Sequence, residues 1–245
     1  MSRFFITCDM IENGVVSLSE EDSQHLSRVL RAKIGEEITV CDDSGMEHTA
    51  KLSEITKKLV KAVITETCEN KSEPKVKVVL FQGLPKGSKM EFIIQKCVEI
   101  GVHSIVPVAT SRAVVKLSEE KGKGKEERWN KIAQEAAKQS SRGVVPKVEG
   151  LISFEEAVER AKEFDLAVIP YEKQEGNSLK AVLRGEKPSS IGVYIGPEGG
   201  FEESEIALAQ EKGIKAVSLG KRILRTETAP ITVLSAVMYE YDWED

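Results

Sequence analysis

The sequence predicts an α/β protein with two parts, a small β-rich unit at the N-terminus and a larger unit built on a mostly parallel sheet. Residues 37–41, 47–55 and 59–65 alternate branched and polar side chains with the two-residue period of strands. From Lys75 onward, strand-like and helix-like segments alternate, which is typical of parallel α/β sheets. Between these two regions, residues 68–74 are polar and end in proline, as linkers often do.

Further strands and one helix complete the expected N-terminal unit. Apolar runs at residues 3–8 and 15–18 predict two strands, and Ser19 opens a helical stretch. Residues 42–45, which read Asp-Asp-Ser-Gly, predict a turn between two of the alternating segments. We therefore expect a small β-barrel.

The larger unit is predicted from the order of its segments. Apolar runs predict strands at residues 76–82, 103–109, 166–170, 191–195 and 216–219. Helical patterns lie between and after them, at residues 86–100, 125–140, 179–184, 202–212 and 229–241. Ser153 predicts one more helix, because its side chain can accept from a backbone amide while the Glu156 side chain reaches back. The alternation favours a mostly parallel sheet.

Composition and charge restrict the class of protein. The chain has 245 residues, of which 40% are hydrophobic and 31% are charged, as in ordinary soluble globular proteins. Its formal net charge of -5 argues against binding nucleic acid by bulk attraction, so nucleic-acid contacts must rest on a local patch. The segment between Arg112 and Lys147 is rich in Lys and Arg and offers one patch, although a solvated helix face explains the same pattern.

The sequence gives no sign of a membrane span, a metal site or a disulfide. No apolar stretch approaches the roughly 20 residues that cross a bilayer, and the N-terminus lacks the pattern of a signal peptide. The four cysteines, Cys8, Cys41, Cys68 and Cys97, have no CxxC spacing. We therefore expect a cytoplasmic, reduced protein that binds neither a membrane nor a metal.

Two glycine-bearing loops near the C-terminus predict a cofactor pocket. Residues 196–201 read Gly-Pro-Glu-Gly-Gly-Phe, and residues 219–229 read Leu-Gly-Lys-Arg-Ile-Leu-Arg-Thr-Glu-Thr-Ala. Each loop joins an apolar run to a helical pattern, where glycines and unpaired backbone groups let another molecule approach the main chain. Neither loop matches a GxGxxG or P-loop fingerprint. Tight turns without a ligand are the alternative, but neighbouring strand ends in an α/β sheet open on one crevice, which favours a site.

The segments that carry a family resemblance span nearly the whole chain. They are residues 25–31, positions between Lys86 and Val102, and residues 135–142, 195–201 and 219–229. Through them the chain resembles the family of ribosomal RNA small subunit methyltransferase E, which places a methyl group on N3 of a uridine in 16S rRNA. The last two segments are the most specific, and both follow a β-rich unit in the order that the family shows.

The resemblance implies a fold that residue patterns alone do not. It implies a PUA-like β-barrel RNA-binding domain in residues 1–72 and a SPOUT methyltransferase domain with a C-terminal trefoil knot in residues 73–245. General topology rules argue against such a knot, because knots are nearly absent among proteins. In the family, the knot loops hold S-adenosylmethionine in a bent conformation and the domain works as a homodimer. The implied partner is 16S rRNA in the small ribosomal subunit.

The resemblance also implies which residues hold the cofactor. Backbone groups of the two loops would contact its adenine and ribose, with Ile223 and Leu224 as apolar walls and Tyr171 as a further lining residue. The expected set is Tyr171, Ile195, Gly196, Glu198, Gly199, Gly200, Leu219, Gly220, Ile223, Leu224, Thr228 and Ala229.

Methylation at uridine N3 requires a proton acceptor, because N3 carries an imide proton that must leave. Glu198 and Glu227 lie in the two loops and are candidates to accept it. Arg222 and Arg225 are candidates to hold the developing charge or a phosphate, and we expect Arg225 to be the more important. Structural roles are open as well: Glu198 could cap a helix or bond its own loop, and the arginines could pair with carboxylates.

Lys and Arg side chains outside the two glycine-bearing loops are expected to contact RNA. The candidates are Arg28, Arg31, Lys33, Lys86, Lys89, Arg112 and Arg142. Since the chain is acidic overall, we expect specificity from RNA shape and from a uridine turned out of its stack. Trp129 fits the apolar side of its helix and is expected in the core. His25 is expected to pack or hydrogen-bond, with an RNA contact or domain docking as the alternative.

Other functions fit parts of the pattern. A SPOUT enzyme that methylates a ribose 2′-oxygen on tRNA or rRNA would use the same pocket, but the barrel and residues 225–228 favour the uridine N3 family. A noncatalytic RNA-binding or assembly protein could keep the fold without the chemistry, and binding of S-adenosylmethionine distinguishes it. A flavodoxin-like oxidoreductase would need a phosphate-binding loop, which we do not find in the sequence.

Overall fold

Two compact units make up the chain in the computed structural model, which describes residues 2–113 and 119–243. The first unit contains Met1–Glu73 and Ala137–Val145, and the second contains Pro74–Ala136 and Pro146–Asp245. The boundary predicted between residues 72 and 73 lies next to the break after Glu73. The sequence pattern does not predict that Ala137–Val145 joins the first unit, because no local signal ties the end of a helix to a sheet far away in the chain.

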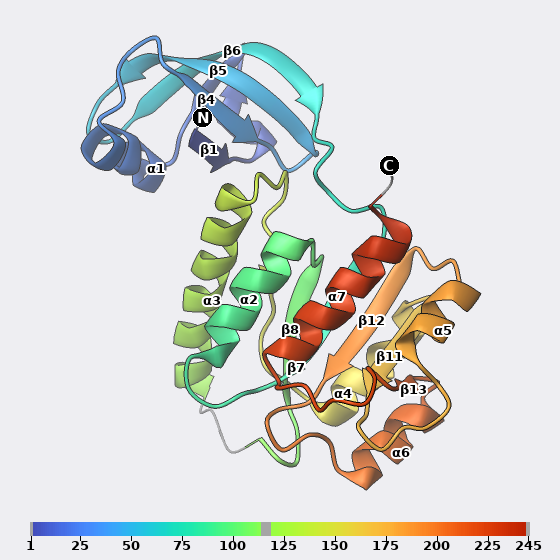
Figure 1. Ribbon diagram of the computed structural model, residues 1–245. Helices are drawn as coiled ribbons and strands as arrows, with labels where there is room; N and C mark the ends of the chain where they lie inside the picture. Colours follow the sequence, from blue (N-terminus) through green and yellow to red (C-terminus); the bar gives the residue numbers. More distant parts are fainter. Residues whose placement is uncertain (1, 114–118, 244–245) are drawn as a thin grey trace. The chain divides into compact units, whose positions relative to one another are not determined.

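The first unit is built on a curved six-stranded sheet (Figure 1). In sheet order its strands are β1 (Ser2–Phe5), β4 (Glu37–Cys41), β5 (Met46–Ile55), β6 (Val60–Glu69), β3 (Val15–Ser17) and β2 (Ile11–Glu12). The β1–β4 pair is parallel and the others are antiparallel. The predicted β-rich unit is confirmed, with one correction. Cys68 and Glu69 belong to β6 and not to a linker, because they pair with Glu47 and Met46 of β5.

A short helical segment crosses the first unit between β3 and β4. Helix α1 (Glu20–Gln24) begins where Ser19 Oγ accepts from the Asp22 amide at 3.1 Å, so the predicted helix start is confirmed. The segment continues as a π-helix, η2 (His25–Leu30), and ends at Arg31 in the left-handed region with a φ of 52°. The sequence does not foretell this change, because the apolar spacing of a π-turn resembles that of an α-helix. A short 3₁₀ turn, η1 (Cys8–Met10), follows β1.

The second unit contains a parallel sheet, as the sequence predicts. Its main strand order is β10 (Ile152–Ser153), β8 (Ser104–Ala109), β7 (Lys77–Gly83), β12 (Ser190–Ile195), β11 (Leu166–Pro170) and β13 (Lys215–Val217), and β9 (Lys147–Val148) pairs with β8. All these pairings are parallel. Strands β9 and β10 are absent from the sequence prediction, because strands of two residues have no readable period.

Helices lie on both faces of this sheet (Figure 1). They are α2 (Lys89–Ile100), α3 (Glu119–Gln139), α4 (Phe154–Glu159) with the 3₁₀ turn η3 (Arg160–Glu163), α5 (Leu179–Gly185), α6 (Glu203–Glu211) and α7 (Thr228–Tyr241). Helices α2 and α7 cover one face, and α4 and α6 cover the other. Helix α2 begins at Lys89, later than predicted, because Gly87 adopts a φ of 66° that no helix allows.

Buried side chains confirm several local predictions. The rings of Phe81 and Tyr194 stack at 4.4 Å in the core against α4 and α6. Ser153 and Glu156 form the predicted capping box, in which Ser153 N donates to Glu156 Oε2 at 2.8 Å. Trp129 is 5% exposed and belongs to the core, as expected. Within the described residues, no helix combines the length and apolar character needed to cross a membrane.

Candidate active site

A cavity of about 460 Å³ opens at the carboxyl ends of three neighbouring strands of the second unit. Strand β11 lies between β12 and β13, so the segments that follow these strands meet at one edge of the sheet. The cavity is lined by both glycine-bearing loops, by Pro170 at the end of β11 and by Tyr171 and Glu172 after it. The prediction that the two loops share a pocket is confirmed in geometry.

Nearly the whole expected cofactor set lies at this cavity. The lining residues from that set are Tyr171, Ile195, Gly196, Glu198, Gly199, Gly200, Leu219, Gly220, Ile223, Leu224 and Ala229. Thr228 is outside the lining, because it begins α7 and its amide donates to the Arg225 carbonyl at 2.9 Å. Ser218, Lys221 and Thr226 line the cavity as well, although the sequence analysis assigns them no role.

Close backbone packing explains the glycines of the first loop. Gly200 has a φ of 67°, and its amide donates to the Pro197 carbonyl at 2.9 Å. A Cβ added at Gly196 would lie 3.1 Å from the carbonyl carbon of Gly200, tighter than nearly all real contacts. The loop therefore folds back on itself and presents main chain to the cavity.

The second loop combines an exposed apolar residue with a buried polar one. Ile223 is 86% exposed, whereas Thr226 is 5% exposed. Gly220 has a φ of 103°, and its amide donates to Ser218 Oγ at 3.2 Å. Thr226 Oγ1 donates to the Gly196 carbonyl at 2.7 Å and accepts from Gln82 Nε2 at 3.1 Å. Gln82 and Thr226 are thus residues at the site that the sequence analysis misses. The only sequence signal for Gln82 is an amide at the end of an apolar strand.

Three charged side chains gather beside the cavity. Lys89 Nζ lies 2.9 Å from Glu198 Oε1 and 3.5 Å from Glu227 Oε2. The Lys86 amide donates to both Glu198 carboxylate oxygens, at 3.2 and 3.3 Å. Partial burial raises the pKa of Glu198, but the hydrogen bonds from Lys89 and from backbone amides outweigh it and hold the pKa below its ordinary value. The bond to Glu198 in turn raises the pKa of Lys89.

The two loop carboxylates differ in their hydrogen bonding. Glu198 bonds Lys89 and the Lys86 amide, while the capping box of α6 is made by Glu202 and Glu205. The helix-capping role considered for Glu198 is therefore filled by another residue. Glu227 Oε2 is buried and has no hydrogen-bond partner among the described residues, since Lys89 at 3.5 Å is too distant for one. Its second oxygen lies 4.0 Å from Arg225.

The candidate arginines lie at the mouth of the cavity. Arg222 and Arg225 both line it, and the Arg225 side chain is 84% exposed. Arg112 NH1 donates to the Gly199 carbonyl at 2.7 Å, and its Nε lies 3.9 Å from Glu202. Arg112 therefore supports the first loop, which leaves its guanidinium only partly available to a phosphate. Among the described residues, no cluster of three or more His, Cys, Asp or Glu side chains could hold a metal ion.

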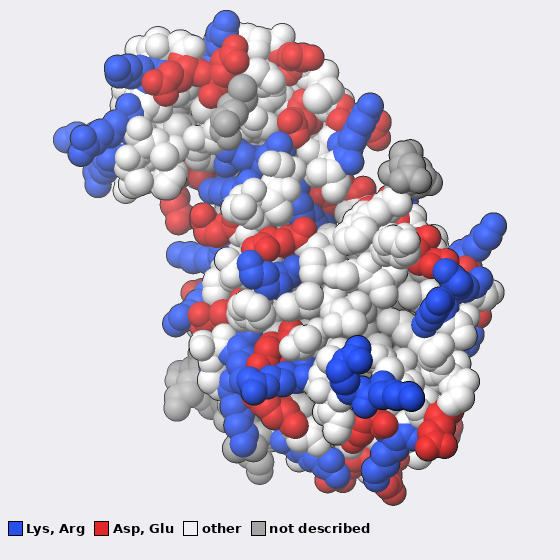
Figure 2. Space-filling model, viewed as in Figure 1, with Lys and Arg blue, Asp and Glu red and all other residues white. Residues whose placement is uncertain are grey.

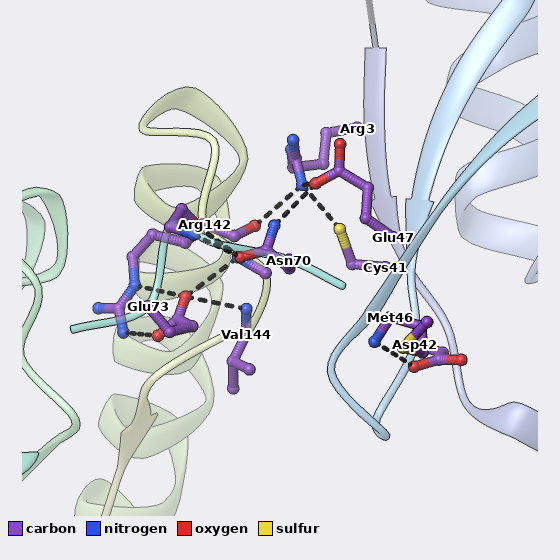
Figure 3. A network of polar contacts seen from close by, with 11 residues as sticks. Arg3, Cys41, Asp42, Met46, Glu47, Asn70, Glu73, Arg142 and Val144 are labelled. Carbon is purple, nitrogen blue, oxygen red and sulfur yellow. Dashed lines mark hydrogen bonds and ion pairs between the residues drawn. The ribbon is translucent and has the colours of Figure 1, made fainter. Parts of the chain in front are cut away.

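The first unit holds the other predicted RNA contacts. Arg28, Arg31 and Lys33 are exposed on and just after the π-helix, and Figure 2 shows cationic side chains around the α1 region. Arg142 is a correction. Its side chain is 4% exposed, and its Nε donates to Glu73 Oε1 at 3.2 Å, so it is not available to RNA (Figure 3). The sequence prediction fails because Glu73, which is distant in the sequence, neutralises the Arg142 guanidinium inside the unit.

Matches to known families agree with this fold and pocket. Residues 71–238 match the family described as RNA methyltransferase domain, and residues 18–65 match the one described as RNA methyltransferase PUA domain. The fold and site therefore define an RNA methyltransferase that carries a PUA domain. The chain is 40% identical to ribosomal RNA small subunit methyltransferase E of Bacillus subtilis, over 98% of this chain and 97% of that protein. It belongs to the ribosomal RNA small subunit methyltransferase E family.

Solved structures support the same assignment. A ribosomal RNA small subunit methyltransferase E from Neisseria gonorrhoeae, bound to S-adenosylmethionine, is 33% identical with a TM-score of 0.88, and the match covers 98% of both chains. A putative methyltransferase from Legionella pneumophila in complex with S-adenosylmethionine is 33% identical with a TM-score of 0.86, over 97% of this chain and 96% of that one. The likeness extends through both units.

Proposed function

We propose that this protein transfers the methyl group of S-adenosylmethionine to N3 of a uridine in 16S rRNA of the small ribosomal subunit. The observation that carries the proposal is the meeting of both glycine-bearing loops in one cavity at the ends of neighbouring parallel strands. The cavity has the size of ordinary small-molecule sites, about 300–1,000 Å³. Its polar backbone and the apolar Ile195, Leu219 and Leu224 suit a nucleoside with a short polar chain. When bound, the cofactor supplies an electrophilic methyl group.

Glu227 is the better supported proton acceptor for uridine N3. Both oxygens of Glu198 accept from the Lys86 amide, and one also pairs with Lys89, so each oxygen already has a hydrogen-bond donor. Its lowered pKa also makes it a weaker base. Glu227 has one buried carboxylate oxygen without a hydrogen bond. The residue before it in the sequence, Thr226, lines the cavity. Lys89 lies between both carboxylates and partly offsets their charge.

Arg225 is the proposed cation for the charge that develops on the uridine oxygens. Its guanidinium is largely exposed at the cavity and is tied only loosely to Glu227. A planar guanidinium holds two N–H donors side by side in a fixed geometry that fits a pair of acceptor atoms, whereas an ammonium lacks this fixed geometry. Replacing Arg225 with Lys should therefore reduce turnover about tenfold or more. Unchanged turnover in R225K would refute this role.

The π-helix region of the first unit is the proposed RNA surface outside the pocket. Three aliphatic side chains are exposed there between cations: Val29 at 67%, Leu30 at 45% and Ile34 at 68%. Arg28, Arg31 and Lys33 lie between and beside them in sequence. Cations bind phosphates without regard to sequence, while exposed aliphatic groups pack against bases and sugars. Lys86 and Arg222 extend the proposed contacts near the cavity.

The homodimer and the knot that the resemblance implies belong to the same proposal. Phe92 of α2 and Tyr239 and Trp243 at the end of α7 are 46%, 70% and 59% exposed, and Figure 2 shows a largely uncharged surface over α7. Such a patch favours burial against a second copy.

The path of the second glycine-bearing loop supports the proposed knot. This loop follows β13, is hydrogen-bonded to the Gly196 carbonyl through Thr226 and continues into α7. We propose that the protein acts in the cytoplasm, consistent with its unpaired cysteines.

The deciding experiment combines the purified protein with labelled S-adenosylmethionine and small ribosomal subunits from a strain that lacks the modification. We expect N3-methyluridine in 16S rRNA when the products are analysed by nucleoside mass spectrometry. A ribose 2′-O-methyl product would reassign the reaction class. Cofactor binding without transfer to any RNA would favour a noncatalytic assembly role. Sedimentation of the same sample tests for a dimer.

A further inference from the structure

Two hydrogen bonds link the end of strand β7 to both glycine-bearing loops, and a third, within β7, orients the Gln82 side chain. Gln82 Nε2 donates to the Gly83 carbonyl at 3.0 Å and to Thr226 Oγ1 at 3.1 Å. Thr226 Oγ1 donates to the Gly196 carbonyl at 2.7 Å. Gln82 is 0% exposed and Thr226 is 5% exposed, so water has little access to the bond between them. The bonds run from the sheet through the second loop to the first loop.

The chemistry of the donors fixes the direction of this chain of bonds. A hydroxyl has one hydrogen, and Thr226 uses it on the Gly196 carbonyl, so its oxygen must accept from Gln82. The amide group of Gln82 has two hydrogens, which serve Thr226 and the Gly83 carbonyl. A reversed amide would place its oxygen against another carbonyl, so the side chain has a single favourable orientation.

Steric contact adds a second link at the same point. A Cβ added at Gly83 would lie 2.7 Å from Pro197 Cδ and 2.8 Å from Pro197 N. The first loop therefore rests directly on the main chain of β7, where no larger residue fits without movement. Together, the contact and the hydrogen bonds place both loops against one strand end.

We propose that Gln82 and Thr226 are positioning residues that hold the two glycine-bearing loops together, so that the cofactor cavity is formed before S-adenosylmethionine binds. The inference rests on the proposed function, because it names that cofactor as the ligand. A preformed site avoids the cost of ordering loops during binding. Loss of the Thr226 hydroxyl also leaves the Gly196 carbonyl and one of the two Gln82 amide hydrogens without this partner, which weakens the arrangement further.

The test is calorimetric titration of the full-length protein with S-adenosylmethionine alone. Thr226→Val keeps the shape of the side chain and removes its hydrogen bonds, and we expect about tenfold weaker binding, equal to about 1.4 kcal/mol. Thr226→Ser restores the hydroxyl and should bind within about threefold of the unmodified protein. The matched control is Thr65→Val in the first unit, where Thr65 Oγ1 donates to the Thr49 carbonyl at 3.1 Å. This control should bind normally.

A double-mutant cycle separates positioning from a general loss of stability. Gln82→Met alone should weaken binding several-fold, and adding it to Thr226→Val should cause little further loss, because both act through one chain of bonds. Full additivity, or normal binding by Thr226→Val, would overturn the inference. If Thr226→Val does not fold, Gln82→Met with normal affinity would overturn it instead. No binding by the unmodified protein would refute the proposed function itself.

Discussion

The charged side chains around Arg142 in the first unit and those at the cavity of the second unit are arranged in opposite ways. In the first unit, Arg142 is buried against Glu73, and Arg3 NH1 reaches Glu47 Oε2 at 2.8 Å and Cys41 Sγ at 2.7 Å (Figure 3). At the cavity of the second unit, Glu227 keeps an oxygen without a hydrogen bond, and the Arg225 side chain is 84% exposed. Charged groups that hydrogen-bond one another closely hold a structure, while charged groups that are paired only loosely are candidates to act on a substrate.

The largest expected effect on the methyl transfer rate comes from replacing Glu227, whose Oε2 has no hydrogen bond among the described residues. Glu227→Gln should lower the methyl transfer rate at least about a hundredfold, because general-base catalysis contributes roughly that much. Its affinity for S-adenosylmethionine and its unfolding midpoint should stay close to those of the unmodified protein. Rates come from single-turnover methylation of small ribosomal subunits.

Glu198→Gln is the matched control for this prediction. Glu198 is bonded by Lys89 and the Lys86 amide, so we expect a smaller loss of rate accompanied by a measurable loss of stability. A larger rate loss in Glu198→Gln than in Glu227→Gln would reverse the assignment of the base.

The buried ion pair of the first unit should show the opposite behaviour. Arg142→Met leaves Glu73 without its cation and should destabilise the first unit by about 3 kcal/mol. The proposed cofactor cavity is in the other unit, so the affinity for S-adenosylmethionine should not change. Denaturant unfolding followed by hydrogen exchange in residues 2–73 measures the effect. Exposed Arg184, at 61%, supplies the control Arg184→Met, which should be nearly neutral.

Next in size is the effect of the π-helix surface on RNA affinity. Removing a cation, as in Arg31→Ala, should weaken binding and reduce the slope of log affinity against log salt by about 0.7 to 0.9. Val29→Ser with Ile34→Ser should weaken binding several-fold without changing that slope, because no counterion is released. Val63→Ser, at a 43% exposed valine elsewhere in the unit, is the control. Binding is measured to small ribosomal subunits across a salt series, and an unaltered affinity in both variants would remove this surface from the proposal.

The smallest expected effect is a dependence of stability on pH at the β4–β5 turn. Burial raises the pKa of Asp42, but hydrogen bonds from His48, Ser44 and the Met46 amide outweigh it and hold the pKa at about 2. Since the ordinary value is 3.8, the ionised carboxylate contributes about 2 kcal/mol at neutral pH. This contribution is complete above about pH 4.5 and is lost as pH falls toward 2.

The matched measurement uses Asp42→Asn. The difference in unfolding free energy between the unmodified protein and this variant should be constant from pH 7 to about pH 4.5 and should shrink below that. A difference that does not change with pH would show that the carboxylate is not specially stabilised in the fold.

The sequence predicts what local patterns encode and misses what distant residues decide. The parallel sheet, the capping box at Ser153 and the glycine-bearing loops follow from period, spacing and backbone freedom. The sequence predicts Arg142 at an RNA surface, because no local signal shows that Glu73 lies against it in the fold. It predicts Gln82 only as part of a buried strand, since the fold alone brings Thr226 within hydrogen-bond distance. The roles assigned to the residues at the cavity remain predictions.

The first unit includes Ala137–Val145, which are synthesised well after the rest of that unit. Its six strands are synthesised early. The hydrogen bond from Arg3 to the Arg142 carbonyl and the ion pair between Glu73 and Arg142 can form only after Arg142 has been synthesised. The intervening Pro74–Ala136 must be made before these bonds can form. The first unit is therefore discontinuous along the chain, and a fragment ending at residue 72 would lack the segment that completes it.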